Sequence, residues 1–185
     1  MRNRIACSIA ILLATGVAIA GPVQKKKKWD VTVVRTFDAP VAKVWRAWSD
    51  SELIKKWWAP TSFTCPVAKI DFRVKGKSLL CMRAPKEMGG GDTYTTWTYS
   101  KIVPNKQIDF VLSFSDKDGR KVSPQSLGLP TGIPGSVRHE ITFKTLAGGK
   151  TEMTYKEFGY TDEMAANLSK MGLDQVLDKM AALFK

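Results

Sequence analysis

The sequence has little of the chemistry on which metal sites and most hydrolases depend. It contains one histidine, His139, and three cysteines among 185 residues. Zinc sites need several cysteine or histidine ligands at short, regular spacings, and no such spacing occurs. The nucleophile elbow Gly-x-Ser-x-Gly, the metalloprotease motif His-Glu-x-x-His and the phosphate-binding loop are also missing. The sequence therefore predicts no metal, no cofactor and no catalytic residue, and it favours a protein that is not an enzyme.

A few titratable residues in predicted strands remain as candidates for catalysis. Asp71 or Glu140 could serve as a general acid or base in a closed pocket, because burial raises the pKa of a carboxylic acid. Asp71, however, is close to Arg73, and His139 is adjacent to Glu140. Adjacent side chains of a strand point to opposite faces of the sheet. We therefore expect structural roles for these residues, and for His139 an ordinary hydrogen-bond partner within its strand.

The composition is that of a globular protein with an excess of positive charge. Hydrophobic residues make up 44% of the chain, charged residues make up 25%, and the formal net charge is +12. Such a charge can bind nucleic acid or an anionic membrane surface. The basic residues are spread along the chain apart from Lys25–Lys28. No helix-turn-helix, zinc-finger or RNP-type motif accompanies them, so we expect a solvated basic surface and no nucleic-acid partner.

The first twenty residues differ from the rest of the chain. Arg2 and Arg4 precede an almost wholly apolar stretch, Ile5–Val17, and an A-x-A cleavage pattern ends at Ala20. From Ile5 to Ala20 the segment has 16 residues, fewer than the ~20 that a membrane-spanning helix prefers. We predict a signal peptide at 1–20, a basic leader at 21–29 and a domain at 30–185 that is periplasmic or secreted.

The lysines after this cleavage pattern allow a second interpretation. Positive residues beside an apolar segment tend to stay on the cytoplasmic side of a membrane. An uncleaved N-terminal segment would then anchor the protein, and Lys25–Lys28 would face inward together with the domain. The membrane is expected as a partner only through this segment.

Cleavage would leave two cysteines, Cys65 and Cys81, which could form a disulfide in an oxidising compartment. They lie on adjacent segments that the pattern folds into a hairpin, with strands at 67–73 and 77–83. Reflection about the turn pairs Cys81 with a residue near Ile70, several positions from Cys65. That separation exceeds the ~7 Å between Cα atoms that a disulfide spans. We therefore predict two buried free thiols.

The remaining pattern predicts one strand, two short helices, six strands and a long C-terminal helix. A loop at 122–135, rich in proline and glycine, is long enough to be functional or mobile. The strands are expected at 29–37, 67–73, 77–83, 93–103, 107–115, 136–146 and 151–158, and the helices at 41–48, 49–58 and 162–184.

The C-terminal helix is predicted to cover the sheet. A single helix cannot cover so many strands if the sheet is flat. We expect the sheet to curl around this helix and to leave an apolar cavity between them. The apolar face of the helix is predicted to consist of Met164, Leu168, Met171, Val176, Met180 and Leu183.

Several short segments also match the pattern of a known family. They are 35–40 (RTFDAP), 44–50 (VWRAWSD), 53–60, 70–77 (IDFRVKGK), 81–83, 102–104 and 172–180 (GLDQVLDKM). Together they resemble the heat-shock-protein-90 ATPase activator-like branch of the START/SRPBCC superfamily, over residues 30–184. Two positions depart from the family pattern. This chain has Lys75-Gly76 where the family usually has Gly-Gly, and Gly172-Leu173 where the family usually has Gly-Trp. The change from Trp to Leu reshapes one cavity wall, so the ligand preference of relatives is not carried over.

The resemblance implies an α+β helix-grip (START-like) fold, with a curved antiparallel sheet wrapped around a long C-terminal helix and two short helices after the first strand. It also implies a deep pocket and roles that range from lipid or polyketide binding to chaperone regulation and aromatic cyclisation. The leading hypothesis is an exported protein that holds a small hydrophobic ligand in this cavity, with its entrance under the 122–135 loop. The alternatives are a cyclase- or hydrolase-like enzyme that uses the same cavity, or a chaperone-interacting module if the domain is cytosolic. The residues predicted to line the cavity are Trp57, Trp58, Phe63, Met82, Trp97, Phe114, Met171 and Gln175.

Overall fold

A computed structural model describes residues 28–185 of the chain. The predicted signal peptide at 1–20 and all but the last two residues of the predicted leader at 21–29 lie outside this range. Within residues 28–185, no helix combines the length and the apolar character needed to cross a membrane.

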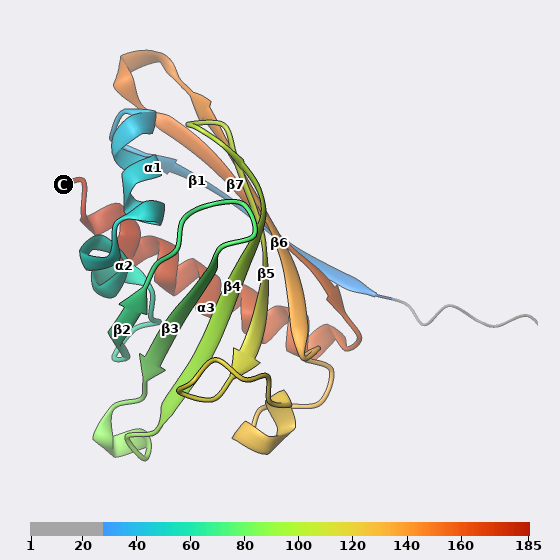
Figure 1. The fold of residues 1–185 in the computed structure, drawn as a ribbon. Coiled ribbons are helices and arrows are strands. Elements are labelled where there is room, and N and C mark those ends of the chain that lie inside the picture. The colour runs from blue at the N-terminus through green and yellow to red at the C-terminus, as the bar shows by residue number, and fades with distance from the viewer. Residues whose placement is uncertain (1–27) are drawn as a thin grey trace, which may run out of the picture.

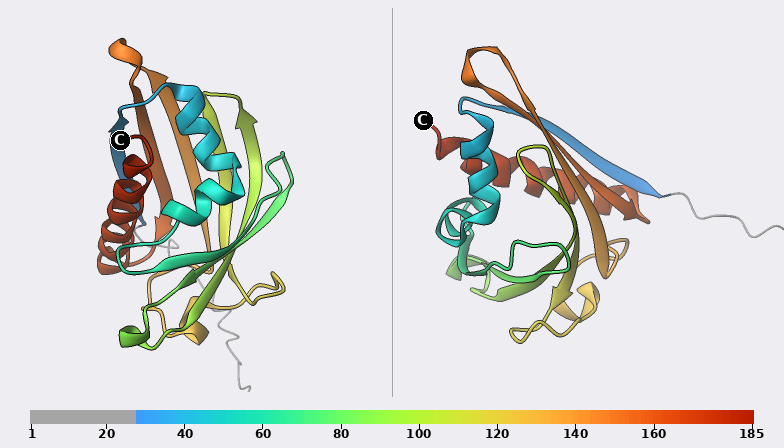
Figure 2. Two further views of the ribbon diagram at one scale, coloured as in Figure 1. Left: turned by 90° about the vertical axis from the view of Figure 1, so that its left-hand side faces the viewer. Right: turned by 45° about the horizontal axis from the view of Figure 1, so that its top comes forward.

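Seven antiparallel strands form one strongly curved sheet (Figures 1 and 2). The sheet order is β1-β7-β6-β5-β4-β3-β2, so the strands from β2 to β7 each pair with their neighbours in the chain, and β1 pairs with β7. The predicted α+β helix-grip fold is confirmed. The strands are β1 (Trp29–Phe37), β2 (Thr64–Lys69), β3 (Lys77–Arg83), β4 (Asp92–Val103), β5 (Gln107–Ser115), β6 (Ser136–Thr145) and β7 (Thr151–Tyr160).

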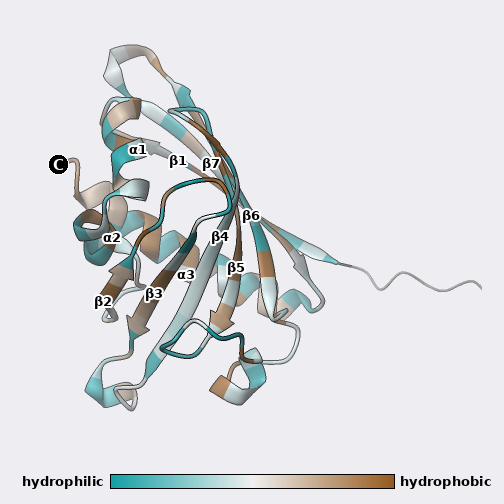
Figure 3. Cartoon of the chain, viewed as in Figure 1, coloured by the Kyte–Doolittle hydropathy of each residue, from teal (hydrophilic) through white to brown (hydrophobic). Residues whose placement is uncertain are grey.

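In the part of the chain that the structure describes, three α-helices are formed, and they lie on the concave side of the sheet (Figure 2). The helices α1 (Val41–Ser49) and α2 (Ser51–Trp57) follow β1, and α3 (Glu163–Ala182) ends the fold. Two aspartates cap the second and third helices, because the Asp50 carboxylate accepts from the first turn of α2 and the Asp162 carboxylate from the first turn of α3. Figure 3 shows hydrophobic residues alternating with polar ones along β6, which is the pattern of a strand with one buried face.

One end of the concave side is filled by aromatic rings. Trp48 of α1 lies against Trp57 of α2 with ring centroids 4.7 Å apart, and against Trp97 of β4 at 6.0 Å. Trp97 stacks on Phe110 of β5 at 4.7 Å, and Tyr155 of β7 meets Trp48 edge-on at 5.6 Å. All five side chains are at most 1% exposed. We call these five residues the aromatic core.

The buried face of α3 is the predicted one only in part. Val176 and Met180 are buried as predicted, and Leu168, although 44% exposed, lines the cavity described below. Met164 and Met171 are 67% and 59% exposed, so their assignment to this face is wrong. A pattern of large apolar residues misses buried alanines, and here two of them define the side of the helix that meets the sheet. The buried residues of α3 are Ala165, Ala166, Leu173, Val176, Leu177 and Met180.

Cys65 and Cys81 are buried free thiols. The predicted register is wrong, because Cys81 faces Val67 and not a residue near Ile70. The reason is that β2 ends at Lys69, so the connection to β3 is longer than the turn assumed from the sequence. Burial raises the pKa of both thiols to about 11, so both stay protonated at neutral pH.

Candidate functional site

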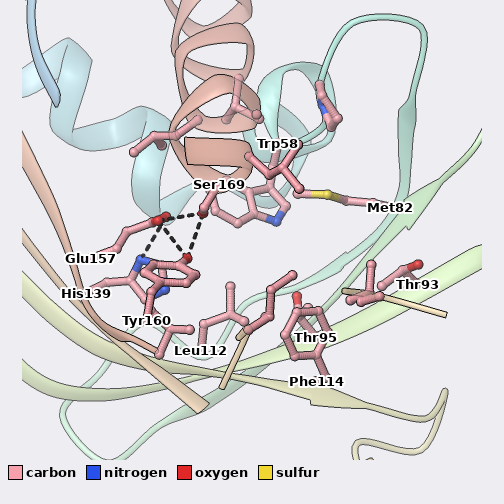
Figure 4. A pocket seen from close by; sticks show the side chains of 18 of the residues that line it. Trp58, Met82, Thr93, Thr95, Leu112, Phe114, His139, Glu157, Tyr160 and Ser169 are labelled. Carbon is pink, nitrogen blue, oxygen red and sulfur yellow. Dashed lines mark hydrogen bonds and ion pairs between the residues drawn. The ribbon is translucent and has the colours of Figure 1, made fainter. Parts of the chain in front are cut away.

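A cavity of about 400 Å³ lies between the sheet and α3 (Figure 4). This volume falls within the ~300–1,000 Å³ that is typical of small-molecule sites. Most of its wall is apolar and comes from β3 to β6, from α3 and from the segment after α2. The loop between β5 and β6 contributes Leu129, Pro130 and Ile133, which places part of the 122–135 loop at the cavity as expected.

Four of the eight residues predicted to line the cavity do lie on its wall. They are Trp58, Phe63, Met82 and Phe114. Phe114 belongs to the inward-facing row of β5, and Trp58 follows directly after α2. The ring of Trp58 also meets Trp97 edge-on at 4.6 Å, so it separates the cavity from the aromatic core.

The other four predicted residues do not form the cavity wall. Trp57 and Trp97 are part of the aromatic core, and the Trp57 indole nitrogen donates to the Ala47 carbonyl oxygen at 3.0 Å. Met171 points outward from α3. The side-chain oxygen of Gln175 accepts a hydrogen bond from the Thr61 backbone at 2.9 Å. These assignments are corrected: Trp97 shares the strand alternation of cavity residues but lies in the core, whereas Trp57, Met171 and Gln175 are helix residues whose side chains the helix positions direct away from the cavity.

Small residues on α3 explain why the cavity is hollow. Ala165 and Ala166 are buried against the rest of the fold, and Ser169 and Gly172 line the cavity. A Cβ atom added at Gly172 would meet no atom within 4 Å. In the first half of α3, the cavity is therefore lined by two small residues, Ser169 and Gly172, and by the larger Leu168.

Four polar side chains gather at one end of the cavity (Figure 4). His139 comes from β6, Glu157 and Tyr160 from β7, and Ser169 from α3. Ser169 Oγ donates to Glu157 Oε2 at 2.6 Å, and the Tyr160 hydroxyl lies 2.9 Å from the same oxygen and 2.7 Å from Ser169 Oγ. We call these four residues the polar cluster.

Burial disfavours the charged forms of the titratable groups in the polar cluster. It raises the pKa of Glu157, although hydrogen bonds from Ser169 and Tyr160 oppose this effect. It lowers the pKa of His139 to about 3, so the imidazole is uncharged at neutral pH. The imidazole stacks on Phe110 at 4.7 Å, and its Nδ1 lies 2.9 Å from the Tyr155 hydroxyl. Nδ1 is 3.7 Å from Glu157 Oε1, too far for a hydrogen bond.

The cavity roles of His139 and Glu157 were not predicted from the sequence. Glu140, the residue adjacent to His139, instead pairs with Arg138 and Lys156. The sequence signal that indicates these roles is the alternation of inward and outward side chains along each strand, which repeats every two residues. His139 shares the inward row of β6 with Val137 and Ile141, and Glu157 shares that of β7 with Tyr155.

His139 and Glu157 are direct cross-strand partners in the register of β6 and β7. A carboxyl group among inward apolar residues is unusual unless it is paired or functional. Asp71, the other carboxyl considered, bonds Arg73 at 2.8 Å and does not line the cavity.

A family model matches residues 38–185 of the chain, and its description is Activator of Hsp90 ATPase homolog 1-like protein. No curated protein matches the sequence. Among solved structures, a protein of Chromobacterium violaceum is 26% identical with a TM-score of 0.68, and the match covers 84% of this chain and 96% of that one. A protein of Mycobacterium smegmatis is 24% identical with a TM-score of 0.66, covering 84% and 90%. The AHSA1 protein of Silicibacter pomeroyi is 16% identical with a TM-score of 0.66, covering 84% and 96%; these last two likenesses show the fold alone.

Proposed function

The chain belongs to the Activator of Hsp90 ATPase homolog 1-like family, and from this membership and the shape of its interior we propose that it binds a small hydrophobic molecule between the sheet and α3. The observation that carries the proposal is the apolar cavity of about 400 Å³. Empty apolar space costs stability, because the atoms that line it lack contact partners. A hollow of this size beside a fully packed aromatic core is best explained by an occupant.

The proposal places this binding outside the cytoplasm. What supports export is the sequence at 1–20, with its basic start, apolar stretch and A-x-A pattern. The intact mass of the protein recovered from cells tests it. A chain that starts at Gly21 supports a periplasmic or secreted carrier or sensor. A full-length chain in the membrane fraction supports the anchored alternative.

Titration with an apolar fluorescent dye tests the binding proposal directly. We expect the dye to bind the wild-type protein in a one-to-one complex and to be excluded from Gly172→Leu, whose side chain would extend into the cavity. Met171→Leu is the matched control, because it places the same side chain on the outward face of the same helical turn. Equal binding by all three proteins would show that the dye binds elsewhere and would contradict the proposal.

The polar cluster favours a second candidate, a cyclase- or hydrolase-like enzyme that uses the same cavity. Burial raises the pKa of Glu157, and such a shift suits a carboxyl group to act as a general acid near neutral pH. The test is to incubate the protein with a molecule that it retains and to follow that molecule by mass spectrometry. Conversion that stops in Glu157→Gln would establish the enzyme, whereas an unchanged molecule would leave the binding protein as the function.

A further inference from the structure

Two hydrogen-bonding atoms on the cavity wall have no partner within the described residues. They are Nε2 of His139 and the indole Nε1 of Trp58, and both are buried. Buried polar groups are nearly always satisfied by protein, water or ligand. Trp48 and Trp97 also have unpartnered indole nitrogens, but these residues belong to the aromatic core and do not line the cavity. Both residues of this pair therefore belong to the wall of the space that an occupant would fill.

The hydrogen bond to Tyr155 decides which nitrogen of His139 carries the proton. The Tyr155 hydroxyl is fully buried, and its partner is His139 Nδ1 at 2.9 Å. Burial raises the pKa of Tyr155 well above its usual value, so the phenol keeps its proton and needs an acceptor. Nδ1 supplies that acceptor, and the single proton of the neutral imidazole then resides on Nε2. The unpartnered atom is therefore a donor, as the Trp58 indole is.

The charges around the cavity exclude an anionic ligand. None of the described residues that line it is lysine or arginine, and the carboxyl group of Glu157 lies at the same end as His139. A carboxylate in this position would lose its hydration without gaining a cation and would lie close to another carboxyl group. Two donors without a counter-charge suit an uncharged oxygen acceptor.

We propose that the occupant is an uncharged carbonyl compound (a ketone, aldehyde or ester) whose oxygen accepts a hydrogen bond from His139 Nε2–H. Trp58, another residue that lines the cavity, is a second donor, and the apolar remainder of the molecule lies against side chains such as Leu112, Phe114 and Val176. The cavity volume equals about thirteen water molecules at ~30 Å³ each. This inference rests on the proposed binding function and narrows it to one class of ligand.

A set of three naphthalene probes tests the ligand class by isothermal titration calorimetry. They are 2-acetylnaphthalene, the hydrocarbon 2-isopropylnaphthalene of nearly equal shape, and the anion 2-naphthoate. We expect the ketone to bind about tenfold more tightly than the hydrocarbon, as one satisfied buried donor implies. The anion should bind most weakly.

The variant that tests the donor replaces His139 and its partner together. In His139→Phe combined with Tyr155→Phe, no buried hydroxyl is left without an acceptor, and the stack on Phe110 is kept. The ketone and the hydrocarbon should then bind with nearly equal affinity. Tyr155→Phe alone removes the hydrogen bond that holds the proton on Nε2, so the preference for the ketone should weaken although the imidazole stays in place. Unchanged affinity for 2-isopropylnaphthalene shows that each variant is folded and keeps its cavity.

The position of the imidazole proton can be measured directly by NMR, because the chain has one histidine. Protein that is labelled with ¹⁵N-histidine and carries no polyhistidine tag gives the NMR signals of one imidazole ring. We expect the neutral tautomer with its proton on Nε2, and a shift of that proton with 2-acetylnaphthalene but not with the hydrocarbon. A proton on Nδ1 would overturn the proposal.

The calorimetric outcomes separate this inference from the proposed function. If both uncharged probes bind equally well to the wild-type protein, or if the naphthoate binds best, the carbonyl proposal fails while the binding function stands. If no probe binds and the apolar dye is also excluded, the binding function itself fails.

Discussion

The two ends of the concave side are built from the same strands, yet one end is solid and the other is hollow. At the solid end, Trp48 and Trp57 from the short helices fill the space over Trp97 and Phe110. At the hollow end, α3 lines the cavity with two small residues, Ser169 and Gly172, and three larger ones, Leu168, Leu173 and Val176, and about 400 Å³ stays open. The strands alternate in the same way at both ends. The two ends therefore differ in how the covering helices fill the concave side, and not in the alternation of the strands.

The largest expected effect comes from two phenylalanines on the same face of β5. Phe110 is 0% exposed in the aromatic core, whereas Phe114 is a partly buried residue of the cavity wall. We expect Phe110→Ala to lower the free energy of unfolding by about 3–5 kcal/mol, because it opens a void in a packed core. Phe114→Ala should cost about 1–2 kcal/mol, because it only widens an existing space. Urea unfolding measures both, and equal costs would mean that the two ends are packed alike.

The second prediction concerns acid sensitivity, which should reside in the hollow end. His139 has a pKa of about 3 when folded, below its usual 6.5. The unfolded chain therefore binds the proton more tightly, and stability is lost as the pH falls below about 6.5. Between pH 7 and pH 5 this group should cost about 2 kcal/mol.

The double variant His139→Phe with Tyr155→Phe isolates that contribution. Its free energy of unfolding should fall less steeply than that of the wild-type protein over the same pH range. Glu157, whose folded pKa is raised, has the opposite slope and loses stability as the pH rises above about 4.5. It is present in both proteins and cancels in the comparison. Parallel pH profiles would contradict the buried neutral state of His139.

The third prediction adds volume to the hollow end. Gly172→Ala should raise the free energy of unfolding by about 0.5–1 kcal/mol, because glycine is unfavourable within a helix and the added Cβ meets no atom within 4 Å. Thermal unfolding of the ligand-free protein measures the change. A loss of stability would show that the space beside Gly172 is already occupied by protein atoms.

The smallest effect is expected on the outer face of α3. Met171→Gln should change the free energy of unfolding by less than about 0.5 kcal/mol, because this side chain is 59% exposed. Leu177→Ala, on the buried face, should cost about 2–5 kcal/mol. If Met171→Gln cost more stability than Leu177→Ala, the apolar face predicted from helical periodicity, which includes Met164 and Met171, would be the buried one.

The fold could be predicted from the sequence because the strand periods, the turn residues and the family segments all pointed to the same architecture. The site could be predicted only in part. Trp58 and Phe114 were assigned to the cavity wall together with Trp57 and Trp97, since alternation gives the face of a side chain but not the volume opposite it. That volume depends on which face of α3 is buried, and this face includes Ala165 and Ala166, which a pattern of large apolar residues hardly registers.

The polar cluster depended on information that single strands do not contain. His139 and Glu157 meet because β6 and β7 pair in one register, and Ser169 joins them from a helix that is distant in the sequence. The alternation along each strand alone predicts that His139 and Glu157 point inward. Their meeting at the end of one cavity was not.

The most direct test of the central claim is native mass spectrometry of the protein purified from its own host, with the intact mass recorded in the same run. We predict a stoichiometric adduct of a small apolar molecule on the wild-type chain and on Met171→Leu, and no adduct on Gly172→Leu. A bare wild-type chain that also excludes the apolar dye would contradict it, and the hollow end would then need an explanation other than a ligand.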